Sequence, residues 1–349
     1  MSTRWRTSSS RRPEMNIKGR DFITTQDFSL QELEGLIRRA REIKLDLLHA
    51  APLAGKSVAL IFLNPSLRTR TTMELAVASL GGTPVTMNVG TDSWTLEHRE
   101  GAVMDAGKTE HVKDAARVLS RIVDAIGVRA FAGLENLEDD LADPVISAFA
   151  RYAEVPVLNM ESALYHPMQG MADLMTIVER RGTAKGAKVT LTWAPHPKAL
   201  PTAVANSFLL AATRLGAKVT LAHPPEFPLP DDVMHLAEDN ARAAGGTLDV
   251  TADQEEALSG AQVVCAKSWG GLPYYGRWQE EKRVRELYAG WIVDERKLGA
   301  TADAFFLHCL PVRRNVEVAD AVLDGPRSAV YDEAENRLHI QTAILEAIL

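Results

Sequence analysis

The sequence has few cysteines, no long hydrophobic run and no excess of positive charge. Its 349 residues contain two cysteines, Cys265 and Cys309, which argues against a disulfide framework and agrees with a reducing, cytoplasmic location. No apolar run approaches the length of a membrane span, so we expect no membrane association. The net charge of −7 argues against a general nucleic-acid-binding protein, and we expect no nucleic-acid partner.

Several sequence signatures of cofactor and metal sites are also absent. No glycine run matches G-x-G-x-x-G, so a Rossmann-type oxidoreductase, the alternative from a different functional class, loses its main support. Gly271 and Gly276 have the spacing of a Walker A loop, but no lysine follows the second glycine. No H-E-x-x-H or paired-cysteine spacing predicts zinc. Glu333 and Glu335 lie close together on a predicted helix, a pattern more typical of a solvated face than of a catalytic pair.

Short apolar runs alternate with amphipathic segments along most of the chain. This alternation is typical of α/β proteins, and at 349 residues it predicts two doubly wound parallel-sheet domains with a site between them. The small and basic segment 182–188 is the predicted boundary between the domains. We expect strands at residues 57–63, 84–88, 125–129, 155–160, 188–193, 217–222, 247–250, 262–266, 291–293 and 305–310.

The first 20 residues differ from the rest of the chain because arginine and serine dominate them and acidic residues are scarce. Organelle transit peptides have this composition, and so do disordered extensions. One short basic run has little discriminating value, so we favour a disordered basic tail over residues 1–20.

The most informative stretch is the polar turn at residues 64–72, which follows a strand and precedes a helix. Ser66 is well placed as the helix N-cap, and free backbone N–H groups at a helix start favour an anion. Thr69, Arg68 and Arg70 add a hydroxyl and two forked cations, which suit a phosphate. The alternative is a solvated first turn, but unpartnered arginines there would oppose the helix dipole. We therefore predict a phosphate-binding turn.

Other polar side chains lie at the carboxyl ends of predicted strands, the edge of a doubly wound sheet where ligands bind. Taken singly, a histidine is usually a satisfied core residue and a cysteine a small buried hydrophobe. The convergence of several such side chains at one edge of the sheet favours a ligand-binding site. The set comprises Arg129, His166 with Gln169, the loop from Lys267 to Gly270, and the run from His308 to Pro311.

Three polar segments, the phosphate-binding turn among them, resemble motifs of the aspartate/ornithine carbamoyltransferase family, and so does Arg129. The segments read Ser-Leu-Arg-Thr-Arg from Ser66, His-Pro-Met-Gln from His166, and His-Cys-Leu-Pro from His308. The resemblance covers residues 23 to 349 and implies transfer of a carbamoyl group from carbamoyl phosphate to an amine. It also implies a homotrimer with the active site at a subunit interface, and no cofactor or metal.

Further segments resemble the N-acylornithine branch of that family. They are Lys267-Ser268-Trp269-Gly270, Met160-Glu161, the Ala-Pro-His-Pro run that ends at Pro197, and Glu335-Asn336-Arg337. The expected acceptor is N-acetyl-L-ornithine in arginine biosynthesis, with N-succinyl-L-ornithine or plain ornithine as alternatives. Thr109 stands where the acetyl enzymes carry glutamate and the succinyl enzymes proline. Glu317 stands where the acetyl enzymes carry a carboxylated lysine, and it retains an anionic carboxylate on a shorter stem.

The resemblance also divides the chain and gives its residues roles. It implies a carbamoyl-phosphate-binding domain at 21–181, an acylornithine-binding domain at 182–325 and a C-terminal helix at 326–349 that packs back on the first domain. Thr69, Arg129 and His166 would be catalytic, donating to the carbonyl oxygen, while Cys309 is a nucleophile by type but better interpreted as an orienting residue. Carbamoyl phosphate would be bound by Ser66, the Leu67 backbone, Arg68, Thr69, Arg129, His166, Gln169, Cys309, Leu310, Arg337 and, from a neighbouring subunit, Trp94. The acylornithine would contact Glu161, Lys267, Leu310, Thr109 and Glu317.

Overall fold

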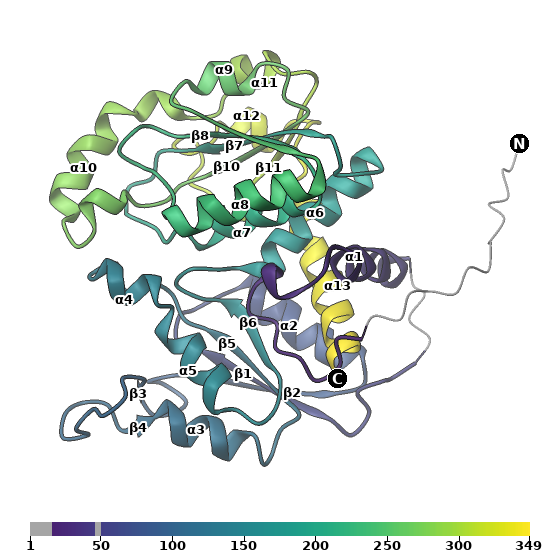
Figure 1. Cartoon of the computed structure of the whole chain (residues 1–349), viewed down its shortest axis with the longest axis vertical. Coiled ribbons are helices and arrows are strands. Elements are labelled where there is room, and N and C mark those ends of the chain that lie inside the picture. Colours follow the sequence, from purple (N-terminus) through teal and green to yellow (C-terminus); the bar gives the residue numbers. More distant parts are fainter. Residues whose placement is uncertain (1–15, 46–49) are drawn as a thin grey trace, which may run out of the picture.

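The computed structural model describes residues 16–45 and 50–349, which form two α/β units stacked one above the other (Figure 1). The lower unit in that view contains a four-stranded sheet and the upper unit a five-stranded sheet. Every strand pair in these two sheets is parallel. The α/β class with two parallel sheets, predicted from the alternation of strands and helices, is confirmed.

The first sheet has the strand order β2-β1-β5-β6. The chain passes from β1 to β2 on one side and later returns to the other side of β1 with β5. The loops after β1 and β5 therefore diverge and leave space for a ligand at their carboxyl ends. The strands are β1 (Ser57–Phe62), β2 (Thr83–Asn88), β5 (Ala125–Arg129) and β6 (Val157–Glu161).

The second sheet has the order β11-β10-β7-β8-β9 and repeats this arrangement, with its switch point between β7 and β10. Lys267 ends one of these two strands and Trp193 the other. The strands are β7 (Lys188–Trp193), β8 (Lys218–Ala222), β9 (Thr247–Thr251), β10 (Val263–Lys267) and β11 (Phe305–Leu307).

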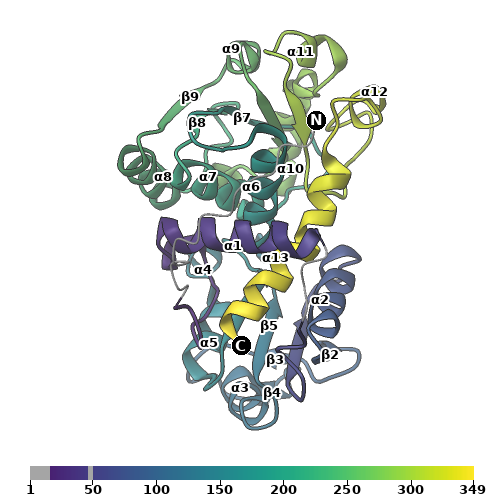
Figure 2. The ribbon, with the colours of Figure 1, turned by 90° about the vertical axis from the view of Figure 1, so that its right-hand side faces the viewer.

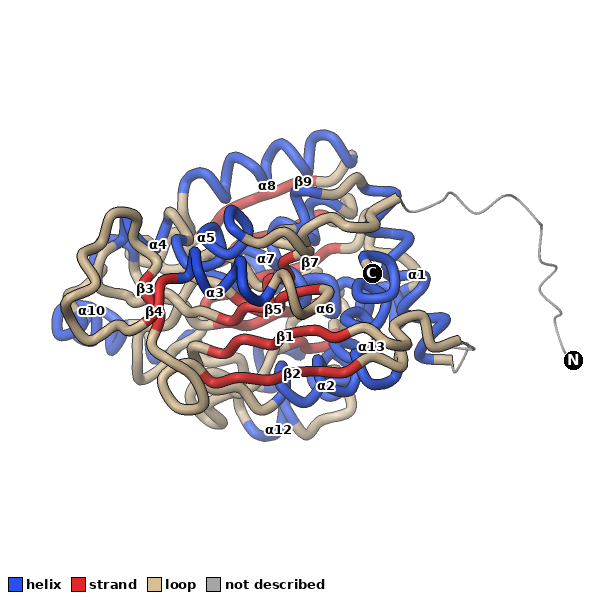
Figure 3. The backbone as a smooth tube through the Cα atoms, turned by 90° about the horizontal axis from the view of Figure 1, so that it is seen from below, coloured by secondary structure: helices blue, strands red, loops and turns tan. Residues whose placement is uncertain are grey.

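A short parallel pair, β3 (Leu96–Glu97) and β4 (Glu110–His111), stands apart from both sheets. Seen from below, this pair lies at one end of the first unit, while β2, β1 and β5 run side by side (Figure 3). The segment from 90 to 111 that contains the pair therefore projects from the body of the unit and is available to meet another molecule.

Helices cover both faces of each sheet. In the first unit they are α1 (Leu30–Lys44), α2 (Arg68–Ser79), α3 (Val112–Leu119), α4 (Leu137–Leu141), α5 (Pro144–Tyr152) and α6 (Pro167–Arg181). The rest are α7 (Ala203–Arg214), α8 (Asp231–Ala244), α9 (Gln254–Leu258), α10 (Trp278–Leu287), α11 (Glu295–Gly299), α12 (Asp320–Leu323) and α13 (Val330–Ile348). Short 3-10 turns occur at η1 (Thr25–Asp27), η2 (Leu272–Tyr274) and η3 (Ala289–Trp291).

Strand β1 illustrates why a continuous apolar run is needed. Its alternate residues face opposite sides of the sheet: Val58 and Leu60 pack with α1, α2 and α13, whereas Ala59 and Ile61 pack with α3 and α5. The first of these cores continues through α6 and α7 to one face of the second sheet. One apolar core thus joins the two units and fixes how their switch points face each other.

Helix α13 crosses from the second unit to the first and packs against α1, α2 and α6 (Figure 2). Arg39 of α1 donates through Nε and Nη2 to the two carboxylate oxygens of Glu346, at 2.6 and 2.8 Å. Such a forked pair holds a guanidinium and a carboxylate in one geometry. This packing carries the polar first half of α13, with Arg337, toward the space between the units.

Two local predictions are wrong. Residues 291–293 do not form a strand: Trp291 ends the 3-10 turn η3 and packs edge-on against Trp193, while Val293 makes a single β-bridge to Val318. The predicted strand 305–310 ends at Leu307. Apolar residues can pack in the core without forming a strand, and periodicity alone does not distinguish the two cases.

The predicted disordered tail extends too far. Residues 1–15, which include Arg4 and Arg12, lie outside the described residues. Ile17, however, is fully buried, and the Gly19 N–H donates to the carbonyl of Ile348 at 2.9 Å. Residues 17–20 therefore belong to the folded body. Among residues 16–45 and 50–349, no helix combines the length and apolar character needed to cross a bilayer.

Candidate active site

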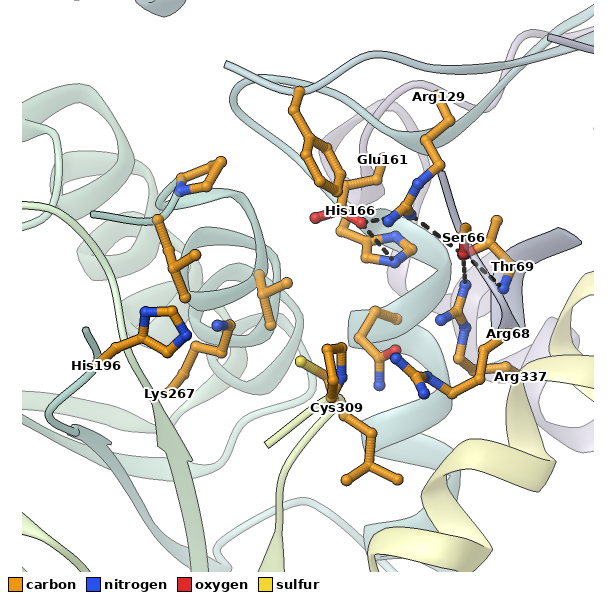
Figure 4. Close-up of a pocket in the computed structure, with 17 residues that line it drawn as sticks. Ser66, Arg68, Thr69, Arg129, Glu161, His166, His196, Lys267, Cys309 and Arg337 are labelled. Atoms are coloured by element: carbon orange, nitrogen blue, oxygen red, sulfur yellow. Dashed lines mark hydrogen bonds and ion pairs between the residues drawn. The ribbon is translucent and has the colours of Figure 1, made fainter. Parts of the chain in front are cut away.

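A cavity of about 170 Å³ lies between the two units, where their switch points meet (Figure 4). Its lining comes from the carboxyl ends of β1, β5, β6, β7, β10 and β11 and from helices α2, α6, α7 and α13. The lining residues are Ser66, Arg68, Thr69, Arg129, Phe131, Glu161, His166, Gln169, His196, Leu200, Pro201, Val204, Lys267, Cys309, Leu310, Pro311 and Arg337.

The predicted phosphate-binding turn contributes Ser66, Arg68 and Thr69 to this cavity. The Ser66 hydroxyl accepts the Thr69 N–H at 3.1 Å and so caps the first turn of α2. Arg70 does not line the cavity: its Nε donates to Glu74 at 3.1 Å, one turn along the helix. The prediction that both arginines of the turn face one anion is therefore wrong, because successive side chains point to different sides of a helix.

Thr69 is the meeting point of three segments that are far apart in the sequence. Its hydroxyl oxygen accepts from Arg129 Nη1 at 3.2 Å and from Arg337 Nη2 at 2.6 Å. Figure 4 shows the two guanidinium groups converging on Thr69, with Arg68 beside them. The cluster is thus formed by the first turn of α2, the end of β5 and the middle of α13.

The three arginines of this cluster carry more positive charge than nearby carboxylates neutralise. Burial, together with the charge of Arg129, lowers the pKa of Arg337 to about 10, and burial also lowers the pKa of Arg68. The Nε atoms of Arg68, Arg129 and Arg337 have no hydrogen-bond partner within the described part of the chain. A small dianion in the cavity would relieve both the repulsion and the missing hydrogen bonds.

Glu161, at the end of β6, links Arg129 to His166. Its Oε2 accepts from Arg129 Nη1 at 2.5 Å and lies 3.5 Å from His166 Nε2. His166 is fully buried, and burial, followed by the charges of Arg337 and Arg129, lowers its pKa well below the usual value. The imidazole is therefore neutral near pH 7 and can donate only one N–H.

The second unit presents a different side of the cavity, seen opposite the arginine cluster in Figure 4. Lys267 ends β10 and is 8 % exposed. His196 follows β7, and burial lowers its pKa, so it adds no positive charge near pH 7. Leu200 and Val204 supply apolar surface. This side holds one lysine among neutral and apolar groups.

The run after β11 contributes Cys309, Leu310 and Pro311 to the lining. Burial raises the pKa of the Cys309 thiol to about 12, so a thiolate nucleophile is disfavoured. A spectator or orienting role for Cys309 stays a prediction. The preceding histidine, His308, does not line the cavity. Its Nδ1 accepts the Leu310 N–H at 3.1 Å and so shapes the turn.

Glu317 lies behind this turn rather than in the cavity. Its Oε2 accepts the Arg313 N–H at 2.6 Å, and its Oε1 is 3.5 Å from His308 Nε2. Burial opposes its ionisation, but the hydrogen bonds and the charge of Lys267 outweigh burial and lower the pKa of Glu317 to about 2. Glu317 does not line the cavity, and its predicted contribution to acylornithine binding stays a prediction.

Three other predicted contact residues also lie away from the cavity. The side chains of Leu67 and Trp94 are 77 % and 65 % exposed, and Thr109 is exposed on the loop before β4. The Thr109 N–H donates to the carbonyl of Thr95 at 3.2 Å. Their roles remain predictions that concern the Leu67 backbone and a neighbouring subunit.

Sequence reasoning missed several lining residues and misread one buried residue. His196, Leu200 and Pro201 lie in segments that follow a strand, a signal that was available, whereas Val204 sits on a helix with a plain apolar pattern. Glu333, interpreted as part of a solvated face, is 1 % exposed and accepts from Gln169 Nε2 at 2.9 Å. The interpretation failed because α13 is surrounded by the two units.

Comparisons with known proteins agree with this geometry. Residues 20–179 match the model of the aspartate/ornithine carbamoyltransferase carbamoyl-P binding domain, and residues 185–348 match that of the Asp/Orn binding domain. The chain belongs to the aspartate/ornithine carbamoyltransferase family. This assignment replaces the oxidoreductase alternative and confirms the family predicted from the motifs.

Relatives within the family differ in their acceptors. The N-acetylornithine carbamoyltransferase of Xanthomonas campestris is 48 % identical over 94 % of this chain and 97 % of its own length. The N-succinylornithine carbamoyltransferase of Bacteroides fragilis is 36 % identical over 94 % of this chain and 98 % of its own. A solved structure of acetylornithine transcarbamylase complexed with acetylcitrulline has a TM-score of 0.92 and 47 % identity, covering 95 % of this chain and 99 % of that one.

Proposed function

We propose that this carbamoyltransferase moves the carbamoyl group of carbamoyl phosphate to the δ-amine of N-acetyl-L-ornithine, giving N-acetylcitrulline and phosphate in arginine biosynthesis. The observation that carries the proposal is the arrangement of the cavity. A cluster of Arg68, Arg129 and Arg337 around Thr69 faces a lysine-bearing, largely apolar side. The first suits a phosphorylated donor and the second an acceptor whose α-amine is an uncharged amide.

At the donor end, Ser66, Arg68, Thr69 and Arg337 hold the phosphate, with the Leu67 N–H at the start of α2. Unpaired guanidinium N–H groups and a capped helix start are what a phosphate dianion needs. Gln169 and the carbonyl of Leu310 orient the carbamoyl NH₂, and Cys309 lines the same end. No cofactor or metal is part of the proposal.

In the transfer step, the lone pair of the uncharged δ-amine attacks the carbamoyl carbon. The new C–N bond forms as the C–O bond to phosphate breaks, and the proton that the amine loses passes to the departing phosphate. Negative charge that develops on the carbonyl oxygen is stabilised by donors from Thr69, Arg129 and the neutral His166. The rate gain comes from orientation and preorganised charge, without a covalent intermediate.

At the acceptor end, Lys267 pairs with the α-carboxylate and Glu161 lies near the amine. A free α-ammonium would be repelled by Lys267, whereas an acylated nitrogen carries no charge. Identity of 46–48 % to N-acetylornithine enzymes, against 36 % to N-succinylornithine enzymes, supports the acetyl group. Thr109 and Glu317 contribute to acceptor selection through a neighbouring subunit and through Lys267.

We further propose a homotrimer in which Trp94 reaches the active site of a neighbouring subunit. Large apolar side chains are exposed along α2, β2 and the projecting loop, among them Leu75, Val85, Trp94 and Val103. Exposed apolar surface of this kind marks an interaction face. We also propose a cytoplasmic location and the domain division 21–181, 182–325 and 326–349, with residues 20–179 and 185–348 matched by separate family models.

The trimer proposal is tested by mixing two inactive variants, Trp94→Ala and Arg68→Ala, after partial unfolding and reassembly. A hybrid trimer can form a site that takes its arginine from one subunit and its tryptophan from the next. Up to a third of the wild-type activity per trimer should return, because one intact interface in three can form. Absence of any rescue, with trimers verified by light scattering, argues against the shared site.

The substrate proposal is tested by one colorimetric assay that offers carbamoyl phosphate with N-acetyl-L-ornithine, N-succinyl-L-ornithine and ornithine in parallel. We expect the highest kcat/KM for the acetyl compound. A preference for the succinyl compound or for ornithine would replace the acceptor but keep the reaction. Failure with all three, in protein that also binds no carbamoyl phosphate, would reject the reaction itself.

A further inference from the structure

Gln169 has a hydrogen-bonding pattern that leaves a single polar atom free. It lies in the first turn of α6, is 1 % exposed and lines the cavity. Its Nε2 donates to Asp173 Oδ1 at 2.7 Å and to Glu333 Oε1 at 2.9 Å. Its Oε1 has no partner among residues 16–45 and 50–349. Since both amide hydrogens are used, Gln169 has only an acceptor to offer a ligand.

The two carboxyl groups that hold this amide are themselves paired. Asp173 lies one turn further along α6, Glu333 lies in the first turn of α13, and each is 1 % exposed. Both accept from the same Gln169 nitrogen, so their carboxyl oxygens lie close together in a buried site. Burial raises the pKa of Asp173 to about 7 and raises that of Glu333 well above its usual value, so the pair holds a proton near neutrality.

This arrangement fixes which way the Gln169 amide faces. A flip of the amide would bring its carbonyl oxygen against Asp173 Oδ1 and Glu333 Oε1, both of which now accept from Nε2. The flipped state would exchange two good hydrogen bonds for repulsion in a buried site. The carbonyl oxygen of Gln169 is therefore held as the group available to the cavity.

Glu333 has a second contact that ties this network to the second unit. Its Oε2 accepts the His308 N–H at 2.8 Å, at the start of the run that carries Cys309 and Leu310. One side chain of α13 thus anchors the first turn of α6 and the turn after β11 at the same time. Both segments line the donor end of the cavity.

We propose that Asp173 and Glu333 are positioning residues that fix Gln169 as a hydrogen-bond acceptor, so that the site selects a donor bearing –NH₂ over one bearing –CH₃ at that position. The inference rests on the proposed donor, carbamoyl phosphate, and adds how the protein distinguishes it from an acyl phosphate of the same shape. The two differ at a single group, and a methyl would leave the Gln169 carbonyl buried and unpaired.

The test uses two stable phosphonates that differ only at this group, phosphonoacetamide and 2-oxopropylphosphonate, with inorganic phosphate as a reference. Calorimetry on the full-length protein gives the ratio of their dissociation constants. We expect wild type to favour the amide roughly 5- to 150-fold, the range that an unsatisfied buried acceptor produces. The ratio reports the contacts to this one group, from the carbonyls of Gln169 and Leu310, separately from phosphate binding, and the variants below isolate the share of Gln169.

The variants separate positioning from general damage. Glu333→Met has a side chain of similar length but cannot accept from Gln169 or from the His308 N–H. We expect the ratio to fall below about threefold. The affinity for inorganic phosphate should stay within about threefold of the wild-type value, since the arginines remain. Glu333→Gln keeps one oxygen that can accept from Gln169 but loses the acceptor for the His308 N–H, so it should retain more of the wild-type ratio than Glu333→Met. Glu335→Met, two residues away on the same helix at a side chain 56 % exposed, is the matched control and should also retain it.

Asp173→Leu is the second disruptive variant, used if Glu333→Met fails a thermal-melt check for folding. A disruptive variant that folds and keeps the wild-type ratio overturns the positioning role. A wild-type ratio near one also overturns it. If wild type binds neither phosphonoacetamide nor phosphate, the proposed function fails instead, so the two failures are distinguishable.

Discussion

The two sides of the cavity are built from different chemistry. The donor side, from the first unit and α13, gathers Arg68, Arg129 and Arg337 around one threonine hydroxyl. The acceptor side, from the second unit, has Lys267 as its charged group among a neutral histidine and apolar residues. A phosphate is recognised mainly by charge and forked hydrogen bonds, whereas an acylated amino acid is recognised mainly by shape and one ion pair.

The difference has an energetic consequence. Burying three guanidinium groups together is unfavourable: burial first, and then the charge of Arg129, lowers the pKa of Arg337, and a bound dianion would offset both effects. The acceptor side stores no comparable repulsion. Substitutions on the donor side should therefore cost more activity than substitutions on the acceptor side, which orders the following predictions.

The largest effect is expected on the donor side, from Arg68→Ala. Loss of a half-buried charged clamp should lower kcat/KM for carbamoyl phosphate by about 10²- to 10⁴-fold. Arg70→Ala is the matched control from the same helical turn, since Arg70 pairs with Glu74 outside the cavity, and it should stay within about fivefold of wild type. Steady-state kinetics at varied carbamoyl phosphate concentration measure kcat/KM for the wild type and both variants. Equal losses in both variants would contradict the assignment of Arg68 to the donor side.

His166 gives the next largest effect, because it is a neutral donor among cations. His166→Ala should lower kcat by about 10²-fold, as for other oxyanion donors. Because its pKa lies well below the usual value, protonation of His166 should produce no acid limb in kcat between pH 6 and 8. A pH–rate profile in which the wild type shows such a limb and His166→Gln does not would contradict a neutral imidazole.

The same shift carries a stability prediction. The unfolded chain protonates His166 near pH 6.5 and the folded chain does not, so below that pH the unfolded state binds more protons and stability falls. His166→Gln removes this term. Urea unfolding at pH 7.5 and 5.5 should therefore show a smaller loss of unfolding free energy in His166→Gln than in wild type; an equal loss would contradict the lowered pKa.

The acceptor side is tested by Lys267→Met, with a smaller expected effect. Loss of a hydrogen-bonded ion pair should raise KM for the acylornithine about 10- to 100-fold and leave the dissociation constant of carbamoyl phosphate nearly unchanged. Lys198→Met is the control, because Lys198 lines a neighbouring cavity near Tyr274 rather than the site. If Lys267→Met weakens donor binding as much as acceptor binding, the division of the cavity into two sides is wrong.

The smallest effect is expected from Thr109→Glu, which adds a negative charge on the exposed loop before β4. It should shift selectivity toward N-acetyl-L-ornithine over N-succinyl-L-ornithine by a few-fold, since like charges repel the succinyl carboxylate. The ratio of kcat/KM values measures the shift. Unchanged selectivity would place acyl discrimination elsewhere, for example along Leu200 and Val204.

Much of the fold could be predicted because strands and helices are local patterns. Strand β1 follows from a continuous apolar run and is confirmed. The N-cap of α2 is Leu67, whereas the predicted cap, Ser66, lies one residue earlier and accepts the Thr69 N–H. The strand predicted at 291–293 failed because an apolar triplet is equally satisfied by aromatic packing against Trp193. Glu333 was misread because the burial of a helix depends on what surrounds it, not on its own sequence.

By itself, the sequence determined the family and predicted the phosphate-binding turn, since contiguous motifs carry their own chemistry. It did not determine which distant side chains form hydrogen bonds with the residues of that turn. Only the tertiary structure decided that Arg337 reaches Thr69 from 268 residues away and that two buried carboxyls hold Gln169. The reason is physical: a hydrogen bond between distant segments depends on how whole units pack, and one apolar core running through both units sets that packing.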